Sequence, residues 1–213
     1  MPTRGLFITV EGIDGSGKTT QFNLIRQYLA ERNIPYKAVR EPGGTEIGEK
    51  IRELILDPAN TGMTGITEML LYAASRAQLV REVIEPSLKK GITVLCDRFT
   101  DSSLAYQGYG RGLSIETIEK LNEIAAFGIK PDITFLFDIH PQLVQGRMKE
   151  NSDRIEKERF DFHKNVYNGY HQIAEKDPGR IKIIDCTKSI EEVFAEVKTY
   201  LDNILITRPD LFE

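Results

Sequence analysis

A glycine-rich stretch near the N-terminus has the residues needed to bind a polyphosphate. Residues 12 to 19 read GIDGSGKT and match the pattern G-x-x-x-x-G-K-[ST]. The glycines let backbone N–H groups converge on phosphate oxygens, Lys18 can reach the β- and γ-phosphates, and the Thr19 hydroxyl can bind Mg²⁺. An apolar segment precedes the stretch and a helical pattern follows it, which favours a binding loop over a structural glycine-rich turn. We therefore predict a nucleoside triphosphate site formed by Gly12, Ile13, Asp14, Gly15, Ser16, Gly17, Lys18 and Thr19.

Asp14 places a carboxylate in the middle of this anion-binding loop. At about 6 Å from a phosphate charge, with an effective dielectric constant near 20, the repulsion would cost roughly 3 kcal/mol per unit charge. Lys18, Mg²⁺ and the backbone donors would offset that cost. We therefore expect Asp14 to have a specific binding partner.

A second group of charged residues follows two other apolar segments. Asp97 ends the segment ITVLCD, where it can hold Mg²⁺ directly or through water; the alternative is an aspartate that caps the next turn. Arg98 adjoins it and can bridge donor and acceptor phosphates, and Arg40 lies just past the end of the second apolar segment. The ends of parallel strands open onto one crevice, so we expect both arginines there, although each alone could form a surface ion pair.

Tyr72 and Arg76 are four residues apart in LLYAASRAQL, so they project from one face of a helix. The ring and the planar guanidinium could stack on a base and read its carbonyl edge. The alternative is a core tyrosine beside a solvated arginine. The segment DSSLAYQGYGRG (101 to 112) adds small hydroxyls, an aromatic ring and an amide, which are groups that can read a nucleoside.

These residues must be positioned by short apolar segments that alternate with longer helical patterns. Near-continuous apolar character is typical of strands covered on both faces, and predicts an α/β fold with a parallel sheet flanked by helices. The predicted strands cover residues 6–11, 36–41, 92–97, 132–138 and 181–185. The predicted helices cover roughly residues 17–32, 46–57, 66–89, 114–127, 141–150, 155–176 and 189–204. Residues 146–164 mix both charges densely, which indicates a solvated face or a mobile lid.

Length and composition limit the classes of function. A chain of 213 residues, 40% of them hydrophobic, suffices for one domain with one core. A net charge of −4 argues against nucleic acid or an anionic membrane as the main partner. No apolar run approaches the length of a membrane span, no signal core precedes the first predicted strand, and Cys96 and Cys186 lack metal or dithiol spacing. We expect a cytoplasmic protein.

The glycine-rich loop alone does not distinguish a kinase from a GTP-dependent switch. A GTPase ordinarily needs an N-K-x-D motif late in the chain, and the sequence has none. A small-molecule kinase needs an acceptor site and cations for the charge that develops on the transferred phosphoryl group. The arginines above can supply both, which favours a kinase.

Taken together, these segments resemble the thymidylate kinases, nucleoside monophosphate kinases that phosphorylate dTMP with ATP. The resemblance covers nearly the whole chain and is carried by VEGIDGSGKTT, REPGGT, LLYAASRAQ, DRF followed by SSLAYQG, KPDITFLFD, and DRIE followed by FHKNVYNGY. It implies a P-loop nucleoside monophosphate kinase fold with a five-stranded parallel sheet, Mg²⁺ with ATP as donor, dTMP as acceptor in dTTP synthesis, and a homodimer. It also implies one domain over residues 1–213 with a lid at about 141–155. The alternative is a related P-loop kinase acting on a deoxynucleoside or another nucleoside monophosphate.

The resemblance also implies roles for single residues. The loop from Gly12 to Thr19 would bind ATP, and Asp14 would hydrogen-bond the 3′-hydroxyl of dTMP. The acceptor contacts implied are Arg98 and Arg40 to the dTMP phosphate, Tyr72 stacked on thymine with Arg76 as its hydrogen-bonding partner, Ser103 and Gln107 around the base, Arg52 on the substrate side, and Tyr106 as the ring that excludes a ribose 2′-hydroxyl.

The family provides the transition-state cation either from the P-loop or from the lid. Position 15 is glycine here, so the lid must supply it, and the candidates are Arg147, Lys149 and Arg154, with Arg154 in DRIE preferred. The catalytic set implied is Lys18, Asp97, Arg98, Arg154 and Arg147. The chain departs from the family pattern at Tyr72, where phenylalanine is common, and at Phe99, where tyrosine often follows the Asp-Arg pair. The helix surface at Met69, Leu70 and Leu71 could form either the dimer face or core.

Overall fold

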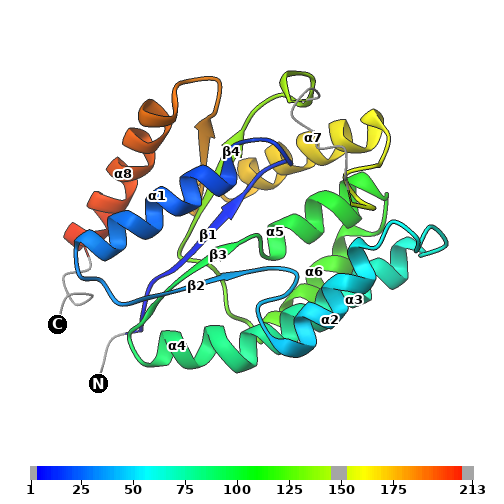
Figure 1. Cartoon of the computed structure of the whole chain (residues 1–213), viewed down its shortest axis with the longest axis horizontal. Coiled ribbons are helices and arrows are strands. Elements are labelled where there is room, and N and C mark those ends of the chain that lie inside the picture. Colours follow the sequence, from blue (N-terminus) through cyan, green and yellow to red (C-terminus); the bar gives the residue numbers. More distant parts are fainter. Residues whose placement is uncertain (1–3, 145–152, 208–213) are drawn as a thin grey trace.

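A five-stranded parallel sheet forms the centre of the computed structural model, which describes residues 4–144 and 153–207. The strand order is β2-β3-β1-β4-β5 (Figure 1). The strands are β1 (Phe7–Glu11), β2 (Tyr36–Arg40), β3 (Thr93–Asp97), β4 (Ile133–Asp138) and β5 (Ile181–Asp185). Each boundary lies within one residue of the predicted one, so the predicted parallel sheet is confirmed.

Helices cover both faces of the sheet and produce three layers (Figure 1). The longer helices are α1 (Lys18–Glu31), α2 (Glu46–Leu56), α3 (Gly65–Leu79), α6 (Ile115–Ala126), α7 (Phe160–Lys176) and α8 (Ile190–Thr207). Successive strand residues point to opposite faces: Ile8 packs in the cluster under α1 and α8, whereas Phe7 packs in the cluster under α3. Within the described residues, no helix is long and apolar enough to cross a membrane.

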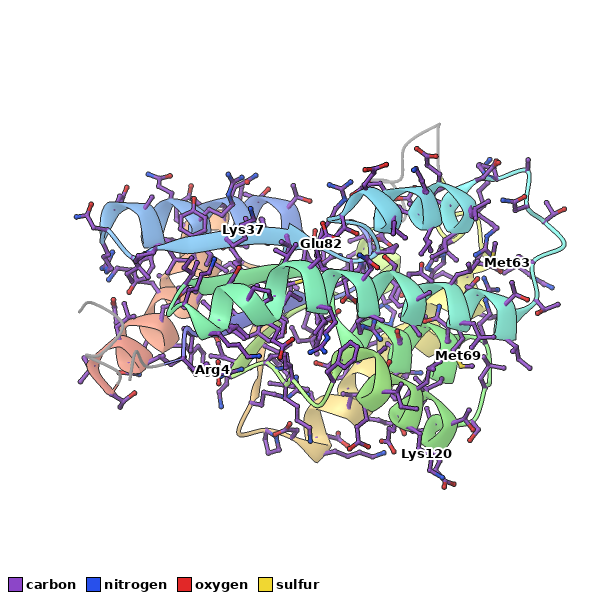
Figure 2. The ribbon with its side chains drawn as sticks, turned by 90° about the horizontal axis from the view of Figure 1, so that it is seen from below. Arg4, Lys37, Met63, Met69, Glu82 and Lys120 are labelled. Carbon is purple, nitrogen blue, oxygen red and sulfur yellow. The ribbon has the colours of Figure 1, made fainter. Side chains whose placement is uncertain are left out.

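The helix predicted over residues 66–89 is a single rod with an irregular middle. It consists of α3, a π-helical turn (Val80–Ile84) and α4 (Glu85–Lys89), and it runs across the view of Figure 2. Pro86 lies in the first turn of α4 and has no backbone N–H to donate, and its ring would clash with the carbonyl of Glu82 in a regular helix. The wider turn before Pro86 relieves this clash and lets the rod continue.

A second irregular helix follows β3, where helical periodicity predicted none. It consists of α5 (Thr100–Ser103) and a π-helix, η2 (Leu104–Gly110). Glycine has a low helix propensity, but Gly110 packs so closely on α7 that a Cβ there would lie 2.7 Å from the Phe162 ring. Tertiary packing against α7 therefore stabilises a helix that the local sequence disfavours.

The region around the predicted lid differs from the prediction on both sides. The helix predicted from residue 155 begins only at Phe160, because the Asp153 carboxylate accepts hydrogen bonds from the backbone of Ile155 (2.8 Å) and Glu156 (2.9 Å) and closes a separate turn. The helix predicted over 141–150 is represented by one 3₁₀ turn, Pro141–Leu143. Its remainder, residues 145–150, lies outside the described residues.

Candidate active site

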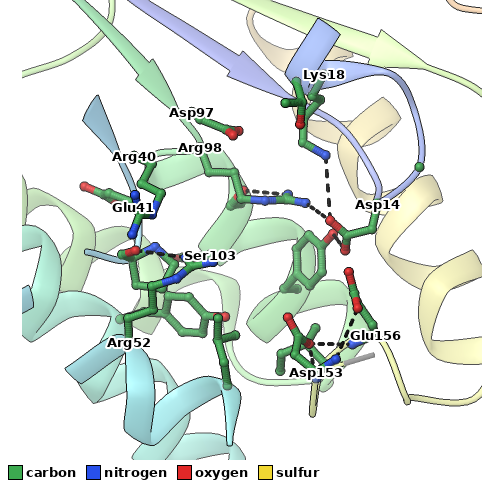
Figure 3. Close-up of a pocket in the computed structure, with 18 of the residues that line it drawn as sticks. Asp14, Lys18, Arg40, Glu41, Arg52, Asp97, Arg98, Ser103, Asp153 and Glu156 are labelled. Atoms are coloured by element: carbon green, nitrogen blue, oxygen red, sulfur yellow. Dashed lines mark hydrogen bonds and ion pairs between the residues drawn. The ribbon is translucent and has the colours of Figure 1, made fainter. Parts of the chain in front are cut away.

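A cavity of about 470 Å³ opens at the carboxyl ends of β1, β2 and β3. Figure 3 shows Lys18 and Asp14 from the glycine-rich loop, Arg40 and Arg52 from the region of β2 and α2, and Asp153 and Glu156 from the turn before α7. The predicted site residues that line it are Asp14, Gly15, Gly17, Lys18, Thr19, Arg40, Arg52, Tyr72, Asp97, Arg98, Ser103, Tyr106 and Gln107. The fold thus brings together residues that are far apart in the sequence.

The glycine-rich loop connects β1 to α1. At Gly12, φ is +136° and a Cβ would lie 2.5 Å from the Phe137 carbonyl oxygen, so only glycine fits. The Lys18 Nζ donates to the carbonyls of Gly12 (2.9 Å) and Ile13 (2.8 Å). Burial, with the charge of Arg98 nearby, lowers the pKa of Lys18 to about 8. Together, the loop and the N-terminus of α1 present a cation and backbone donors to the cavity.

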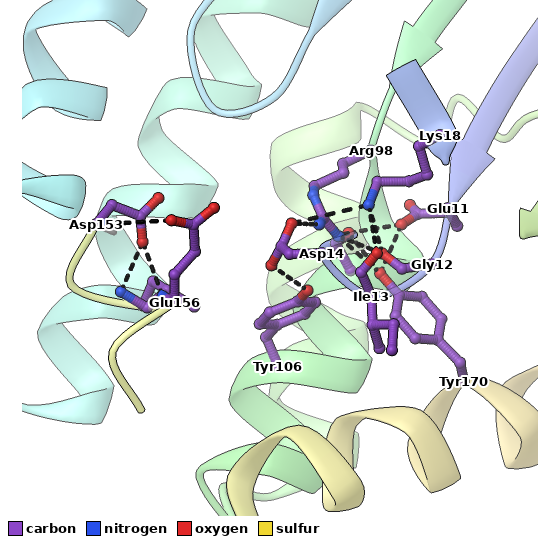
Figure 4. A network of polar contacts seen from close by, with 12 residues as sticks. Glu11, Gly12, Ile13, Asp14, Lys18, Arg98, Tyr106, Asp153, Glu156 and Tyr170 are labelled. Atoms are coloured by element: carbon purple, nitrogen blue, oxygen red, sulfur yellow. Dashed lines mark hydrogen bonds and ion pairs between the residues drawn. The ribbon is translucent and has the colours of Figure 1, made fainter. Parts of the chain in front are cut away.

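Asp14 is the carboxylate that bridges this loop to the opposite wall. Its Oδ1 lies 2.5 Å from Nη2 of Arg98 and 3.8 Å from Nζ of Lys18, and its Oδ2 accepts a hydrogen bond from the Tyr106 hydroxyl at 3.1 Å (Figure 4). Burial alone would raise the pKa of Asp14, but Arg98 and Lys18 hold it well below its ordinary value. Asp14 is therefore ionised at neutral pH and partly neutralised by two cations.

Arg98 is held in place from several sides. Its φ is +66°, which is the left-handed region that side-chain-bearing residues seldom adopt. Its Nη1 donates to the Gly12 carbonyl (3.0 Å) and the Tyr170 hydroxyl (3.2 Å). The guanidinium is thus fixed between the glycine-rich loop and α7, with its side chain 17% exposed at the cavity.

Glu11, which sequence reasoning missed, lies beneath Arg98. It is fully buried and accepts hydrogen bonds from the Phe99 backbone (2.7 Å), the Ser102 hydroxyl (2.6 Å) and the Tyr170 hydroxyl (2.8 Å) (Figure 4). Burial, together with the charge of Asp101, raises the pKa of Glu11 to about 7. A glutamate that ends an apolar strand directly before the loop is the sequence signal that could have identified it.

Asp97 and Thr19 line the same cavity and fit a magnesium site. The Oδ1 atom of Asp97 is buried without a hydrogen-bond partner among the described residues, which is an arrangement that a cation or its water would satisfy. No described group contains three or more His, Cys, Asp or Glu residues able to hold a metal ion. A set of two oxygen ligands suits Mg²⁺, which usually binds one or two protein groups together with phosphates and water.

The pairing of Tyr72 with Arg76 differs from both predicted arrangements. Tyr72 lines the cavity, as expected for a stacking ring. Arg76 is only 1% exposed and is absent from the lining, so it is neither solvated nor directed at the cavity. Its donors are engaged by Glu41 Oε2 (2.8 Å), Asn122 Oδ1 (2.5 Å), Ser103 Oγ (2.9 Å) and the Phe99 carbonyl (3.1 Å). Contact between Arg76 and a base stays a prediction.

Of the predicted lid cations, the structure describes only Arg154, which lies away from the cavity lining. Arg154 is half-buried beside Glu68, with 2.6 Å between Nη2 and Oε2, and its Nε donates to the Ile55 carbonyl at 2.8 Å. It does not line the cavity. Arg147 and Lys149 lie outside the described residues. Gly12, Ile13 and Ser16 shape the loop without lining the cavity.

Arg40 and Arg52, which were predicted to contact the acceptor, do line the cavity. Arg40 pairs with Glu49 at 2.7 Å, and Arg52 donates to the Pro42 carbonyl at 3.0 Å. Sequence reasoning missed Glu41, a buried glutamate of this wall whose Oε1 has no partner among the described residues. The other lining residues that it missed are Pro42, Leu56, Ser102, Asp153, Ile155 and Glu156.

Comparison with known proteins gives a consistent result over nearly the full chain. The family model described as thymidylate kinase matches residues 10–197. A thymidylate kinase from Symbiobacterium thermophilum is 45% identical over 204 residues, which cover 95% of each chain. One from Clostridium novyi is 48% identical over 93% of this chain and 98% of its own. The crystal structure of thymidylate kinase from Ehrlichia chaffeensis superposes with a TM-score of 0.75 and 36% identity, covering 93% of this chain and 99% of that one.

Proposed function

The chain belongs to the thymidylate kinase family, and from this premise we propose how its residues transfer the γ-phosphoryl group of ATP to dTMP. The products are ADP and dTDP. The observation that carries the residue assignment is that the glycine-rich loop, Arg40 and Arg98 line the same cavity. One end of this cavity suits a triphosphate, and the other suits the phosphate of a nucleoside monophosphate.

We assign the donor end to the glycine-rich loop. Residues 12–19 bind the ATP phosphates through backbone N–H groups. The Lys18 side chain is already buried within this loop, where its Nζ donates to the Gly12 carbonyl. Mg²⁺ bound with ATP would be held by Thr19 and Asp97 and would neutralise charge on the phosphates. Exchange of the Lys18 hydrogen bonds from loop carbonyls to phosphate oxygens would orient the γ-phosphoryl group.

We assign the acceptor end to Arg98, Arg40 and Arg52, with Tyr72 stacked on the base. The acceptor phosphate oxygen is already anionic near neutral pH, so it needs no strong general base. Catalysis is then positioning together with charge neutralisation by Lys18 and Arg98. Gln107, on η2, and Ser103, at the end of α5, contact the base.

Asp14 has two functions in this assignment. It orients Arg98 through their ion pair, and it accepts a hydrogen bond from the 3′-hydroxyl of dTMP. A carboxylate offers about four lone-pair positions, so its bonds to Arg98 and Tyr106 leave capacity for a sugar hydroxyl. Tyr106, held by Asp14, would then lie beside the sugar and exclude a 2′-hydroxyl.

We assign the transition-state cation to the lid at residues 141–155, with Arg154 preferred and Arg147 as the second candidate. Arg154 pairs with Glu68 behind the cavity wall, so this assignment requires Arg154 to leave that carboxylate when the site closes. Closure would also exclude water and limit hydrolysis of ATP.

We further propose a homodimer of single-domain subunits that acts in the cytoplasm. Of the residues predicted for the contact, Met69 is 7% exposed and belongs to the core, whereas Leu70 is 51% exposed. Ile66, one turn before Leu70 on α3, is 57% exposed and enlarges the apolar surface. Sedimentation velocity of the full chain and of Leu70→Glu tests this: the variant is expected to sediment as a monomer.

The experiment that tests the activity is a coupled ADP-release assay with Mg²⁺ and ATP. dTMP, dUMP, dCMP, dGMP, AMP and thymidine are offered in parallel. Turnover with dTMP well above the others is expected. Turnover with thymidine but not dTMP would contradict the assignment of Arg98 and Arg40 to an acceptor phosphate.

A further inference from the structure

Glu68 is a buried carboxylate that lies behind the cavity wall and is not part of its lining. It is on α3, one turn before Tyr72. Its Oε1 accepts hydrogen bonds from Nε2 of Gln107 (2.8 Å) and Nε of Arg111 (3.2 Å). Its Oε2 accepts from Nη2 of Arg111 (3.0 Å) and Nη2 of Arg154 (2.6 Å). Glu68 thus joins α3, η2 and the turn before α7 at one point.

The contact with Gln107 determines which end of that amide faces the cavity. Burial alone would raise the pKa of Glu68, but hydrogen bonds from Arg111 and Gln107 lower it, so Glu68 is ionised at neutral pH. An ionised carboxylate only accepts hydrogen bonds, and the amide group of Gln107 must therefore turn its NH₂ toward Glu68. Gln107 lines the cavity, and no described residue donates to its carbonyl oxygen. That oxygen, an acceptor, is the group left for a substrate.

The pairing edges of the pyrimidine bases differ in what they offer to such an acceptor. Thymine and uracil carry an N3–H donor, whereas the N3 of cytosine is itself an acceptor. An acceptor held in the cavity wall forms a hydrogen bond with the first two bases and repels the third. A freely rotating amide could turn its NH₂ to cytosine and would lose this discrimination.

We infer that Glu68 is a specificity-determining positioning residue, which holds the Gln107 amide with its carbonyl toward the base and so selects dTMP and dUMP against dCMP. This inference rests on the proposed function, since it requires the base to contact Gln107. Before the site closes, Arg111 and Arg154 both keep Glu68 ionised. After Arg154 leaves on closure, Arg111 still does so, and Arg111 is itself anchored by Glu158 at 2.5 Å.

The substitution Glu68→Gln tests the inference because it should shift the base preference in one direction, toward cytosine. Oε2 of Glu68 faces two cationic donors, Nη2 of Arg111 and Nη2 of Arg154, whereas Oε1 faces one, Nε of Arg111, together with Gln107. The new amide is therefore expected to keep its oxygen at the Oε2 position, so its NH₂ takes the place of Oε1, which had accepted from Gln107. Two NH₂ groups cannot face each other without loss, and the Gln107 amide is expected to turn over. Its NH₂ then points into the cavity, where it suits the N3 of cytosine.

The measurement is the ratio of kcat/KM for dUMP to that for dCMP, two substrates that both lack the 5-methyl group. Where turnover of dCMP is too slow to measure, the ratio is taken instead from the inhibition constants of dUMP and dCMP in competition with dTMP. We expect Glu68→Gln to shift this ratio toward dCMP by roughly 10- to 100-fold. In a Gln107→Met background the same substitution should leave the ratio unchanged, because no amide remains to turn.

Glu158→Gln is the matched control, since it removes one negative charge from the same network but leaves the contact between Glu68 and Gln107 intact. It should preserve the ratio. Equal losses for dUMP and dCMP in Glu68→Gln would overturn the inference and make Glu68 a purely structural residue. If Glu68→Gln does not fold, Glu68→Asp keeps the charge but withdraws it from Gln107, and an unchanged ratio there would equally overturn the inference. Wild-type protein that fails to use dTMP at all would contradict the proposed function instead.

Discussion

Substitution of Asp14 by asparagine should impair the use of dTMP while leaving ATP binding intact. Asparagine has the same shape but no charge, so the change removes the attraction to Arg98 at 2.5 Å and to Lys18 at 3.8 Å. The Arg98 guanidinium then loses the partner that orients it toward the acceptor phosphate. The hydrogen bond to the 3′-hydroxyl is also weakened, because a neutral amide oxygen is a poorer acceptor than a carboxylate.

The size of the effect follows from how exposed the ion pair is. A unit charge at 3.8 Å, with an effective dielectric constant near 20, corresponds to about 4 kcal/mol before desolvation is subtracted. Loss of one partner from a buried pair costs about 3–5 kcal/mol, and exposed pairs contribute less than about 1 kcal/mol. The Asp14 side chain is 29% exposed, between these limits, so we expect about 2 kcal/mol. This corresponds to a decrease of about 30-fold in kcat/KM for dTMP.

The expected effect on the donor has the opposite sign. Asp14 lies in the same cavity as the phosphate-binding loop, and its charge repels the phosphates of ATP. The KM for ATP should therefore stay unchanged or fall. This difference in sign separates a substrate-specific role of Asp14 from a general collapse of the loop.

The assay is coupled ADP release, with dTMP varied at saturating ATP and ATP varied at saturating dTMP. Calorimetric titration with a non-hydrolysable ATP analogue measures donor binding separately. Tyr106→Phe serves as the control, because it removes one hydrogen bond to Asp14 at 3.1 Å and keeps the ion pair with Arg98. A KM for ATP that rises as much as the KM for dTMP would refute the reasoning.

Substitutions at three further positions test other parts of the site. Arg154→Ala should lower kcat at least about 10-fold with little change in the KM for dTMP, and a pure KM effect in steady-state kinetics would contradict its role. Glu11→Gln should remove a pH dependence of stability, because the pKa of Glu11 in the folded state is raised to about 7. In the wild type, the stabilisation from protonated Glu11 is present below pH 4.5 and is lost as pH rises through 7, a loss of about 3 kcal/mol in the free energy of unfolding. Urea unfolding of wild type and variant across this pH range measures the difference, and parallel pH profiles would disprove the assignment. Tyr72→Phe should retain dTMP affinity and Tyr72→Ala should lose it about 10-fold or more in calorimetry, since stacking needs the ring but not the hydroxyl.

The centre of the sheet was predictable from sequence because β1, β3 and β4 are buried on both faces. A short run such as ITVLCD can bury its apolar side chains on both faces at the centre of a parallel sheet covered by helices. The helices were less predictable where tertiary contacts override local preference. The π-helix Leu104–Gly110 contains two glycines, and only its close packing on α7 explains why it forms.

The glycine-rich loop was predictable because the residues that form it are neighbours in the sequence. The partners of the functional arginines were not. Arg98 and Asp14 are separated by 84 residues, and Arg154 and Glu68 by 86. Periodicity and motif spacing carry no information on such pairs. A weak signal existed for Glu68: it shares the helix face of Tyr72, which was predicted to contact a base or the core, and no role was predicted for this carboxylate.

The described arginines assigned to the substrates share one feature: a nearby carboxylate or carbonyl oxygen already holds each of them. The pairs on the cavity wall are Arg98 with Asp14, Arg40 with Glu49, and Arg52 with the Pro42 carbonyl. Each cation is therefore positioned before substrate arrives, which lowers the entropy lost on binding. Each substrate anion must also compete with an internal oxygen for its arginine, so part of the attraction is cancelled. A kinase that must release a multiply charged anionic product after every turnover benefits from that cancellation, because uncompensated arginines would hold dTDP as firmly as they bind dTMP.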